Sequence, residues 1–346
     1  MTKQIPHPTL SQVARKAGVG TTTVSRVING GQRVSRETLA HVRRVIEKLG
    51  YMPPEAARIL RGHRTKTIGI VIPSIADPFF SCCAEAAQAI ARAYDSLLIV
   101  AVTGNDPRTE SENLNILKRH RVDGLLIVPA TLQSPVLREL VDRVALPVVA
   151  IDRPVTNSLI VSVVCDNFQG ALTAAQHLID HRYKRIICLT GESSLYTIRK
   201  RMHCYRKAVE CARLACIFDA SVKDYQSAEY AFRSLLDGPN PPDAIFTTKN
   251  STTIYAFEAL QKLNVAVLRS IALFGFDDFE LASTVRPSIS VIQQPVEEIG
   301  RRAAEILFGQ LLGERRTGST ASSKLAQPVL LQTRLIRRNC LGCTTK

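Results

Sequence analysis

From residue 67 to residue 338, short apolar runs alternate with longer stretches of helical periodicity, and this alternation narrows the fold more than any other feature. Such short apolar runs are typical of parallel strands that are buried on both faces. Strands that alternate with helices predict doubly wound α/β sheets. The runs fall into two series, which predicts two lobes: Ile68–Ile72, Leu97–Val102, Gly124–Val128 and Val148–Ile151 in the first, and Arg185–Leu189, Ala244–Thr247 and Ile271–Phe274 in the second.

Ligands of open α/β sheets bind outside the carboxyl ends of the strands, and this rule directs attention to four loops. Asp77 to Phe80 follow the first strand, and residues 197–201 open a helix after Gly191. Lys249-Asn250 and Asp277-Asp278 each follow a strand of the second series. Taken singly, each polar residue is also compatible with a place on the surface, and the two phenylalanines are also compatible with core packing.

Positive charge is concentrated at the N-terminal end of the chain. The 346 residues carry a formal net charge of +15, and residues 1–66 hold 13 Lys and Arg against 3 Asp and Glu, so +10 of the excess lies there. A local basic cluster attracts polyanions such as nucleic acids. Because these basic residues are interleaved with a helical apolar pattern, we favour a folded basic module over a solvated tail.

Three helical stripes occupy the same N-terminal segment, with Gly18 after the first, Asn29-Gly30-Gly31 after the second and Gly50 after the third. Two short helices joined by a glycine-containing turn and covered by a third predict a helix-turn-helix module. A generic three-helix bundle is the alternative. The apolar positions are Leu10, Val13, Ala14 and Ala17, then Val24, Val27 and Ile28, then Leu39, Val42, Ile46 and Leu49.

The second of these helices leaves Thr21, Thr22, Thr23 and Arg26 free to face outward. Arginine can bond guanine O6 and N7 together, and threonine can bond a base or contact a thymine methyl. These side chains therefore suit the major groove of DNA.

Several other protein classes fit the sequence poorly. No apolar run approaches the ~18 residues that span a bilayer, and Met1–Gln12 lacks the features of a secretory signal. Nine cysteines, an odd number, favour reduced thiols over a disulfide framework. Cys340 and Cys343 have C-x-x-C spacing without the second pair that a zinc site needs, so we expect a frayed tail there. We expect a cytoplasmic chain without membrane contact, metal or cofactor.

Enzyme signatures are also missing. The sequence has no G-x-x-x-x-G-K-[ST], H-E-x-x-H or G-x-S-x-G motif. Asp277 and Asp278 are adjacent on one predicted loop, which does not make an acid–base pair. We therefore expect a protein that is not an enzyme.

At the N-terminal helices the chain resembles the lactose-repressor (LacI/GalR) family of bacterial transcription regulators. The resemblance is carried by TLSQVARKAGVGTTTVSRVING and RVSRETLAHVRRVIEKLGYMPP, and it continues over almost the whole chain in RTKTIGIVIPSIADPFF, RHRVDGLLIVPA, PVVAIDRP, KRIICLTG, FGFDDFE and PSISVIQQP. It implies an N-terminal all-α helix-turn-helix domain followed by a periplasmic-binding-protein-like α/β effector domain of two doubly wound lobes.

The resemblance also implies domain limits. It gives a DNA-binding domain over 1–51, a hinge helix and linker over 52–66, an effector-binding and dimerisation domain over 67–338, and a tail over 339–346. Lobe 1 would hold about 67–166 and 296–324, and lobe 2 about 167–295 and 325–338, with crossovers near Asp166, Pro295 and Lys324. The last apolar run, Pro328–Ile336, would be a returning strand.

The resemblance assigns DNA contacts, including an apolar wedge from the hinge into the minor groove. Two features depart from the family. Gly20 stands where Ser or Thr usually caps the recognition helix, at a cost of a few tenths of a kcal/mol and of a phosphate contact. Pro53-Pro54 stands where Pro-Asn usually begins the hinge helix. The implied contact residues are Thr9, Thr21, Thr22, Thr23, Arg26, Asn29, Arg33, Ala57 and Leu60, of which Leu60 is the wedge.

The resemblance further implies an effector pocket formed by Asp77, Phe80, Thr197, Arg201, Tyr225, Lys249 and Asp277. Arg201 and Asp277 would hold polar groups of the ligand, Phe80 would stack on it, and Thr197 would donate a hydrogen bond. Lys249-Asn250 replaces the family's common Asn-Asp, a local change from negative to positive. Because Lys and Arg hold anions well, we hypothesise an anionic effector, with a solvent-facing Lys249 as the alternative.

Together these features predict a sequence-specific DNA-binding transcriptional regulator, with repression as the commoner family behaviour. A homodimer would read a near-palindromic operator in double-stranded DNA. A sugar, sugar acid or sugar phosphate bound between the lobes would release or tighten DNA binding. The alternative is a regulator of the same fold that is controlled by a protein partner.

Overall fold

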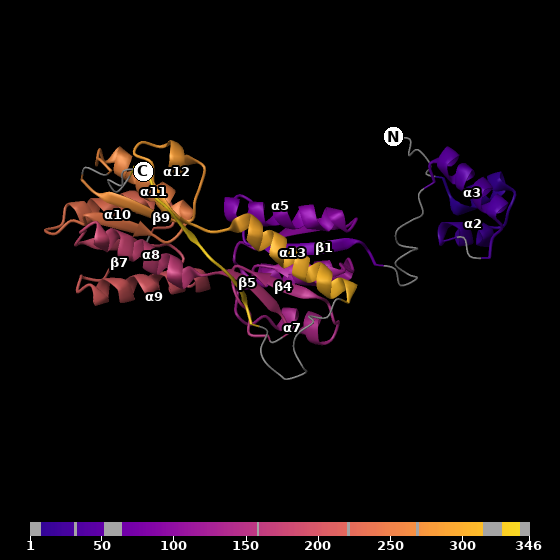
Figure 1. Ribbon diagram of the computed structural model, residues 1–346, viewed down its shortest axis with the longest axis horizontal. Coiled ribbons are helices and arrows are strands. Elements are labelled where there is room, and N and C mark those ends of the chain that lie inside the picture. The colour runs from indigo at the N-terminus through magenta and orange to yellow at the C-terminus, as the bar shows by residue number, and fades with distance from the viewer. Residues whose placement is uncertain are drawn as a thin grey trace. The chain divides into compact units, whose positions relative to one another are not determined.

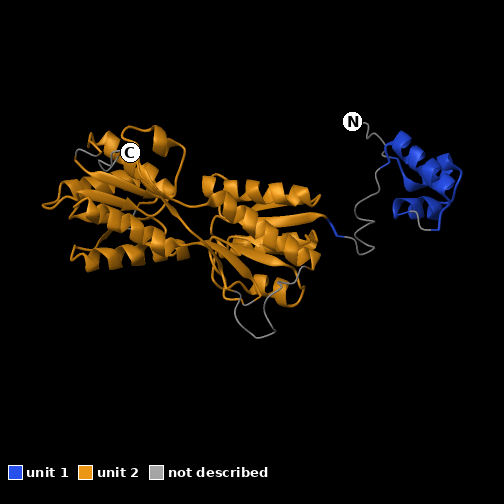
Figure 2. Cartoon of the chain, in the orientation of Figure 1, with its two compact units in different colours: residues 1–65 blue, residues 66–346 orange. Residues whose placement is uncertain are grey.

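The computed structural model describes residues 8–30, 33–51, 64–157, 159–219, 222–267, 270–313 and 327–339. The chain divides into two compact units, Met1–Thr65 and Lys66–Lys346 (Figure 2). Each unit has a hydrophobic core of its own. Most of the predicted hinge, including Ala57 and Leu60, lies outside the described residues, as do Cys340 and Cys343.

The first unit is a helix-turn-helix with a covering helix: α1 (Leu10–Ala17), α2 (Thr21–Ile28) and α3 (Arg36–Leu49). Thr9 caps α1 in a reciprocal arrangement, because its hydroxyl accepts from the Gln12 amide while the Gln12 side chain accepts from the Thr9 amide. The helices enclose Val13, Val24 and Val42, each with no exposed surface. The predicted module is therefore present.

The second unit consists of two lobes, each built on a six-stranded sheet (Figure 1). The sheet of lobe 1 has the order β11-β5-β4-β3-β1-β2, and that of lobe 2 has the order β12-β10-β9-β8-β6-β7. Among the paired strands, only β12 runs antiparallel to its neighbour. This is the expected pair of doubly wound lobes.

Lobe 1 contains β1 (Thr67–Ile72), α5 (Pro78–Ala93), β2 (Leu97–Val102), α6 (Pro107–Arg119), β3 (Gly124–Ile127), α7 (Pro135–Asp142), β4 (Val148–Ile151), β5 (Val161–Cys165), α13 (Val296–Leu312) and β11 (Val329–Leu331). Helices α5 and α13 lie side by side on one face of its sheet (Figure 1). Gly300 permits this close approach, because a Cβ there would lie 2.2 Å from the carbonyl oxygen of Cys83.

Lobe 2 contains α8 (Asn167–Asp180), β6 (Ile186–Leu189), α9 (Tyr196–Cys211), β7 (Ile217–Asp219), α10 (Tyr225–Leu236), β8 (Ala244–Thr247), α11 (Asn250–Lys262), β9 (Ala272–Phe276), α12 (Leu281–Thr284), β10 (Ser290–Gln293) and β12 (Arg334–Ile336). Its core is centred on Tyr205, Phe232, Phe246 and Phe274, all fully buried.

The chain passes between the lobes at three places: after β5, after β10 and between β11 and β12 (Figure 1). The expectation that Pro328–Ile336 forms one strand of lobe 2 is wrong. Val329–Leu331 pairs with β5 of lobe 1, and only Arg334–Ile336 pairs with β10 of lobe 2. The polar pair Gln332-Thr333 interrupts the apolar run, and the chain crosses there.

The run Leu97–Val102 was expected to be a buried strand, and this too needs correction. It forms β2, which is the edge strand of lobe 1 and pairs with β1 alone. Leu97, Val100 and Val102 are 62%, 39% and 43% exposed. Apolar composition therefore predicts that this segment is a strand, but it does not predict whether the strand lies at the centre or at the edge of the sheet. No helix in the described part of the chain is both long enough and apolar enough to cross a membrane.

Candidate functional site

The predicted DNA contacts that lie in described residues are on the surface of the first unit. Thr21, Thr22 and Arg26 of α2 are exposed, and Thr23 is half-buried. Thr9, Asn29 and Arg33 are also exposed. The N-cap of α2 is Gly20, which supplies no side-chain hydrogen bond to the first turn. The helix therefore presents hydroxyls and one guanidinium at its solvent side.

Six of the seven predicted effector residues line one cavity of about 40 Å³ between the lobes: Asp77, Phe80, Thr197, Arg201, Lys249 and Asp277. They come together because each follows a parallel strand or opens the helix after it. Asp77 and Phe80 come from lobe 1, and the other four come from lobe 2. Phe79 and Phe80 are also part of the lobe 1 core and meet edge to face.

Arg201 is the most tightly held of these residues. It is 3% exposed. Its Nε donates to Asn167 Oδ1 at 2.7 Å, and its Nη1 donates to the Thr248 carbonyl oxygen at 2.7 Å. The same Nη1 lies 3.4 Å from Asp277 Oδ2. Because Asn167 is the first residue of α8 after the first crossover, Arg201 joins the cavity to a segment that connects the lobes.

Asp277 occupies a backbone conformation with a φ of 74°, which non-glycine residues rarely adopt. Its Oδ1 accepts a hydrogen bond from Gln294 Nε2. Gln294 follows β10 at the second crossover and is 5% exposed. The Asp277 carboxylate is therefore held by the Arg201 guanidinium of α9 on one side and by the Gln294 amide of the connecting segment on the other.

Asp77 and Lys249 meet across the cavity. Lys249 Nζ lies 3.1 Å from Asp77 Oδ2, and Asn250 Nδ2 donates to Asp77 Oδ1 at 3.2 Å. Asp77 also caps α5 by accepting from the Phe79 amide at 3.1 Å. The side chain of Lys249 is 34% exposed. Lys249 thus neither points only to solvent nor offers an unpaired ammonium to a ligand.

The sequence analysis missed Asp152 and Arg153, which line the same cavity. They directly follow β4, so the strand-end rule applied to Val148–Ile151 would have found them. Arg153 Nη1 donates to Asn105 Oδ1 at 2.8 Å, and Arg153 Nε lies 3.3 Å from Asp152 Oδ2. Burial raises the pKa of the Asp152 carboxyl, although Arg153 and Arg201 act in the opposite direction.

Unsatisfied hydrogen-bonding groups gather at this cavity. Among the described residues, three buried side-chain atoms have no hydrogen-bond partner: Arg153 Nε, Gln294 Oε1 and Thr190 Oγ1. The first two belong to residues that line the cavity. Because unpaired buried polar groups are costly, such a pair commonly marks a place where a ligand or water bonds. Arg153 Nε is nevertheless ion-paired with Asp152 Oδ2 at 3.3 Å, so the unpaired group that the cavity offers is the acceptor Gln294 Oε1.

Comparisons with known proteins agree with this architecture. Residues 9–54 match the family model described as bacterial regulatory proteins, lacI family. Residues 65–333 match the model described as periplasmic binding proteins and sugar binding domain of LacI family. The chain belongs to the LacI family.

Relatives within the LacI family include the ribose operon repressor of Escherichia coli (strain K12), which is 32% identical over 94% of this chain and 96% of its own length. The transcriptional regulator CelR of Thermobifida fusca is 31% identical over 89% of this chain and 93% of its own. These relatives are DNA-binding regulators. The solved complex of a regulator CelR with cellobiose is 28% identical, with a TM-score of 0.69, and covers 96% of this chain and 99% of that one. The lac repressor dimer bound to operator shares the fold, with 23% identity and a TM-score of 0.82 over 97% of this chain and 99% of that chain.

Tyr225 does not belong to the cavity of this LacI-family chain. It begins α10, and Lys262 Nζ lies 5.0 Å from the centroid of its ring. Its ring packs against the outer part of the lobe 2 core. The structure therefore does not place Tyr225 among the residues that line the inner cavity, and its contact with an effector stays a prediction.

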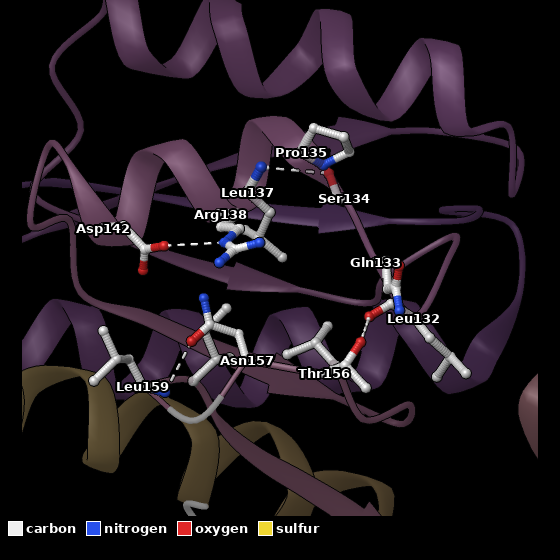
Figure 3. A pocket seen from close by; sticks show the side chains of 12 residues that line it. Leu132, Gln133, Ser134, Pro135, Leu137, Arg138, Asp142, Thr156, Asn157 and Leu159 are labelled. Atoms are coloured by element: carbon white, nitrogen blue, oxygen red, sulfur yellow. Dashed lines mark hydrogen bonds and ion pairs between the residues drawn. The ribbon is translucent and has the colours of Figure 1, made fainter. Parts of the chain in front are cut away.

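Several larger hollows lie outside the inner cavity, and one of about 410 Å³ shares Phe79, Asp277 and Gln294 with it. Another of about 660 Å³ lies between the lobes and shares Asn105, Arg153 and Leu195 with it, so it forms a mouth. A third, of about 460 Å³, lies on lobe 1 beside α7 (Figure 3). There Arg138 pairs with Asp142 at 3.2 Å, and the Thr156 hydroxyl donates to the Leu132 carbonyl at 2.7 Å. Its polar groups are largely paired within the lobe, which separates this groove from the charged cavity. No group of three metal-ligating side chains occurs among the described residues.

Proposed function

We propose that the chain is a ligand-responsive transcriptional repressor that acts as a homodimer on a near-palindromic operator. Each first unit would read one half-site through α2, and the basic residues of this unit would supply salt-dependent affinity for phosphates. Ala57 and Leu60 of the hinge would enter the minor groove. The similarity to the ribose operon repressor over nearly the whole chain supports this function. No cofactor or enzymatic step is part of the proposal.

The exposed edge of lobe 1 supports a second copy as partner. Leu97, Val100 and Val102 of β2 leave apolar surface at a strand edge, which soluble proteins usually cover. A two-fold dimer would place two DNA-binding units on one duplex. Effector binding between the lobes would change their relative orientation and so the affinity for DNA.

We propose a small neutral sugar as the effector, and one observation carries this choice. Gln294 Oε1 is buried beside the cavity without a hydrogen-bond partner, and a sugar hydroxyl can donate to it. The charges of the cavity are already balanced, because Asp77, Asp152 and Asp277 face Lys249, Arg153 and Arg201. An anion would leave this set with a net negative charge.

The anionic effector expected from Lys249 is therefore the second candidate. It would have to take Lys249 from Asp77 and leave that buried carboxylate without its ammonium partner. Control by a protein partner is the third candidate. The six predicted residues that line one cavity favour a small molecule over this one.

A thermal-shift series on the full chain tests the effector. D-ribose, D-gluconate and ribose 5-phosphate represent a neutral sugar, a sugar acid and a sugar phosphate. A ligand that binds the native state raises the melting temperature by mass action. We expect a shift with ribose alone. A shift with only the two anions would favour the anionic effector, and none with all three would favour a protein partner.

Fluorescence anisotropy with duplex DNA from upstream of the chain's own gene tests the DNA reading. Arg26→Ala should weaken binding by about 1–3 kcal/mol, roughly 5- to 150-fold in Kd. Arg138→Ala is the matched control, because it removes the same charge from a side chain of the second unit that is 79% exposed. Equal affinity of wild type and Arg26→Ala would count against base reading by α2.

A further inference from the structure

Lobe 1 and lobe 2 are joined across the inner cavity by their own side chains. The strongest link is the ion pair of Lys249 Nζ with Asp77 Oδ2 at 3.1 Å, supported by the bond from Asn250 Nδ2 to Asp77 Oδ1. Asp77 begins α5 of lobe 1, whereas Lys249 and Asn250 begin α11 of lobe 2. The pair therefore spans the boundary that an effector has to cross.

A second link bridges the lobes at the mouth of the cavity. Asn105 Nδ2 of lobe 1 donates to Glu192 Oε2 of lobe 2 at 3.2 Å. Asn105 is held in turn by Arg153, whose Nη1 donates to its Oδ1. This link joins neutral and charged groups at an exposed rim, so it is weaker than the partly buried ion pair.

The space that these links enclose is too small for a sugar. The inner cavity measures about 40 Å³. A water molecule needs about 10–15 Å³ on this measure, so the cavity holds roughly three waters. A pentose is several times larger, and the walls are buried side chains of both lobes. Entry of an effector into this inner cavity, beyond the larger mouth of about 660 Å³ beside it, thus requires the lobes to separate, which lengthens the Lys249–Asp77 contact.

We propose that Lys249 and Asp77 form a latch that holds the two lobes closed, so that an effector must release the pair in order to bind. The latch competes with the effector, because only the open form of the protein can bind it. The apparent affinity for the effector is therefore reduced by the fraction of molecules that are open. The closed arrangement itself does not depend on the identity of the effector. Only the competition rests on the proposed function.

A direct ligand contact is the competing role for Lys249. The two roles predict opposite effects of removing the ammonium. Loss of a ligand contact weakens effector binding, whereas loss of a latch increases the open fraction and strengthens it. Lys249→Gln and Asp77→Asn both remove the ion pair. Asn remains a good N-cap residue, so Asp77→Asn preserves the start of α5.

Lobe separation is measured by single-molecule energy transfer in the full chain. The dyes are attached through noncanonical amino acids at Arg138 in lobe 1 and Tyr230 in lobe 2, whose side chains are 79% and 78% exposed. Labelled chains are mixed with an excess of unlabelled chains, so that each oligomer carries one labelled copy. Lys262→Gln is the control, because Lys262 pairs with Glu229 at 2.7 Å within lobe 2.

We expect Lys249→Gln and Asp77→Asn to shift the transfer efficiency in the same direction and Lys262→Gln to leave it unchanged. Wild type should move toward the variants as NaCl is raised, because salt screens a partly exposed pair. Circular dichroism establishes that each variant is folded. Identical efficiencies for wild type and both latch variants at low salt would overturn the proposal.

Titration with D-ribose by calorimetry then separates the latch from the proposed function. Lys249→Gln should bind ribose several-fold more tightly than wild type does. A shift in energy transfer without ribose binding in either protein would leave the latch standing and refute ribose as the effector. Weaker binding by Lys249→Gln, together with unchanged energy transfer, would assign Lys249 to direct ligand contact instead.

Discussion

The guanidinium carbon of Arg201 lies 3.7 Å from the centroid of the Phe276 ring. The charge of α9 is thus stacked on an aromatic face at the end of β9, immediately before Asp277. The guanidinium of Arg201 also makes two short hydrogen bonds and one ion pair, so most of its polar groups are already occupied within the protein. Arg201 therefore has a structural role in lobe 2 in addition to any contact with an effector.

Replacing Arg201 should destabilise lobe 2. Arg201→Met leaves the buried Asp277 carboxylate without its cation, which costs about 3–5 kcal/mol in comparable buried pairs. The urea midpoint of unfolding should fall accordingly, and Arg201→Lys should recover only part of the loss. Arg206→Met, on the exposed side of the same helix, is the control. An unchanged midpoint for Arg201→Met would mean that the pair contributes little to stability.

His177 should make stability depend on pH. Burial, followed by the charges of His181 and Arg337, lowers the pKa of His177 from 6.5 to about 4. Between pH 6.5 and pH 4 the imidazole of His177 is protonated in the unfolded chain but stays neutral in the folded chain. The free energy of unfolding therefore falls as the pH decreases from about 6.5 to 4. His177→Gln should flatten this part of the curve of urea midpoint against pH. The exposed His120 provides the comparison, since His120→Gln should leave the slope as it is.

The contact between α5 and α13 should not tolerate a methyl group. In Gly300→Ala the new Cβ would meet the Cys83 carbonyl oxygen at 2.2 Å, and a backbone atom cannot move aside without shifting a helix. We expect a loss of about 1–3 kcal/mol in the free energy of unfolding. Gly238→Ala has only ordinary contacts from 3.5 Å outward and should be nearly neutral. Similar urea midpoints for the two variants would show that α13 can shift freely.

Restoring a cap to the recognition helix should strengthen DNA binding. Gly20 has an extended backbone, and its nearest neighbour to a new Cβ is Thr22 Oγ1 at 3.5 Å, so serine fits. A serine hydroxyl would cap α2, at a gain of a few tenths of a kcal/mol, and would reach a phosphate. Anisotropy at fixed salt should rank Gly20→Ser above wild type. Gly20→Ala adds the Cβ without the hydroxyl, and equal gains from both variants would refute the phosphate contact.

The part of the site that was predictable follows from strand ends. Asp77, Lys249 and Asp277 were found because each follows an apolar run, and parallel strands bring their carboxyl ends to one edge. Asp152 and Arg153 obey the same rule but were passed over. Gln294 directly follows β10, a strand that the apolar runs did not indicate, and Asn105 comes shortly after β2, so the same rule applies to both residues. Tyr225 follows β7, but β7 is the edge strand of lobe 2, and the residue lies outside the inner cavity.

The fold was predictable to the level of lobes but not of sheet edges. The alternation of runs and helices indicated two doubly wound lobes, and both are present. The edge position of Leu97–Val102 and the division of Pro328–Ile336 between two sheets depend on which strand lies alongside. The pattern of apolar residues in the sequence shows which segments can form strands. It does not show which strand lies next to which in the sheet.

The three crossovers between the lobes bear on how the chain is made. The first unit is a continuous segment, Met1–Thr65, and helices α1, α2 and α3 are complete once that segment has left the ribosome. Lobe 1 lacks α13 and β11, and lobe 2 lacks β12, until synthesis has reached Leu331 and Ile336. Late in translation the nascent chain therefore contains a complete DNA-binding module and two sheets that still lack strands. Termination before Val329 would release chains with a complete DNA-reading module but without β11 in lobe 1 and β12 in lobe 2.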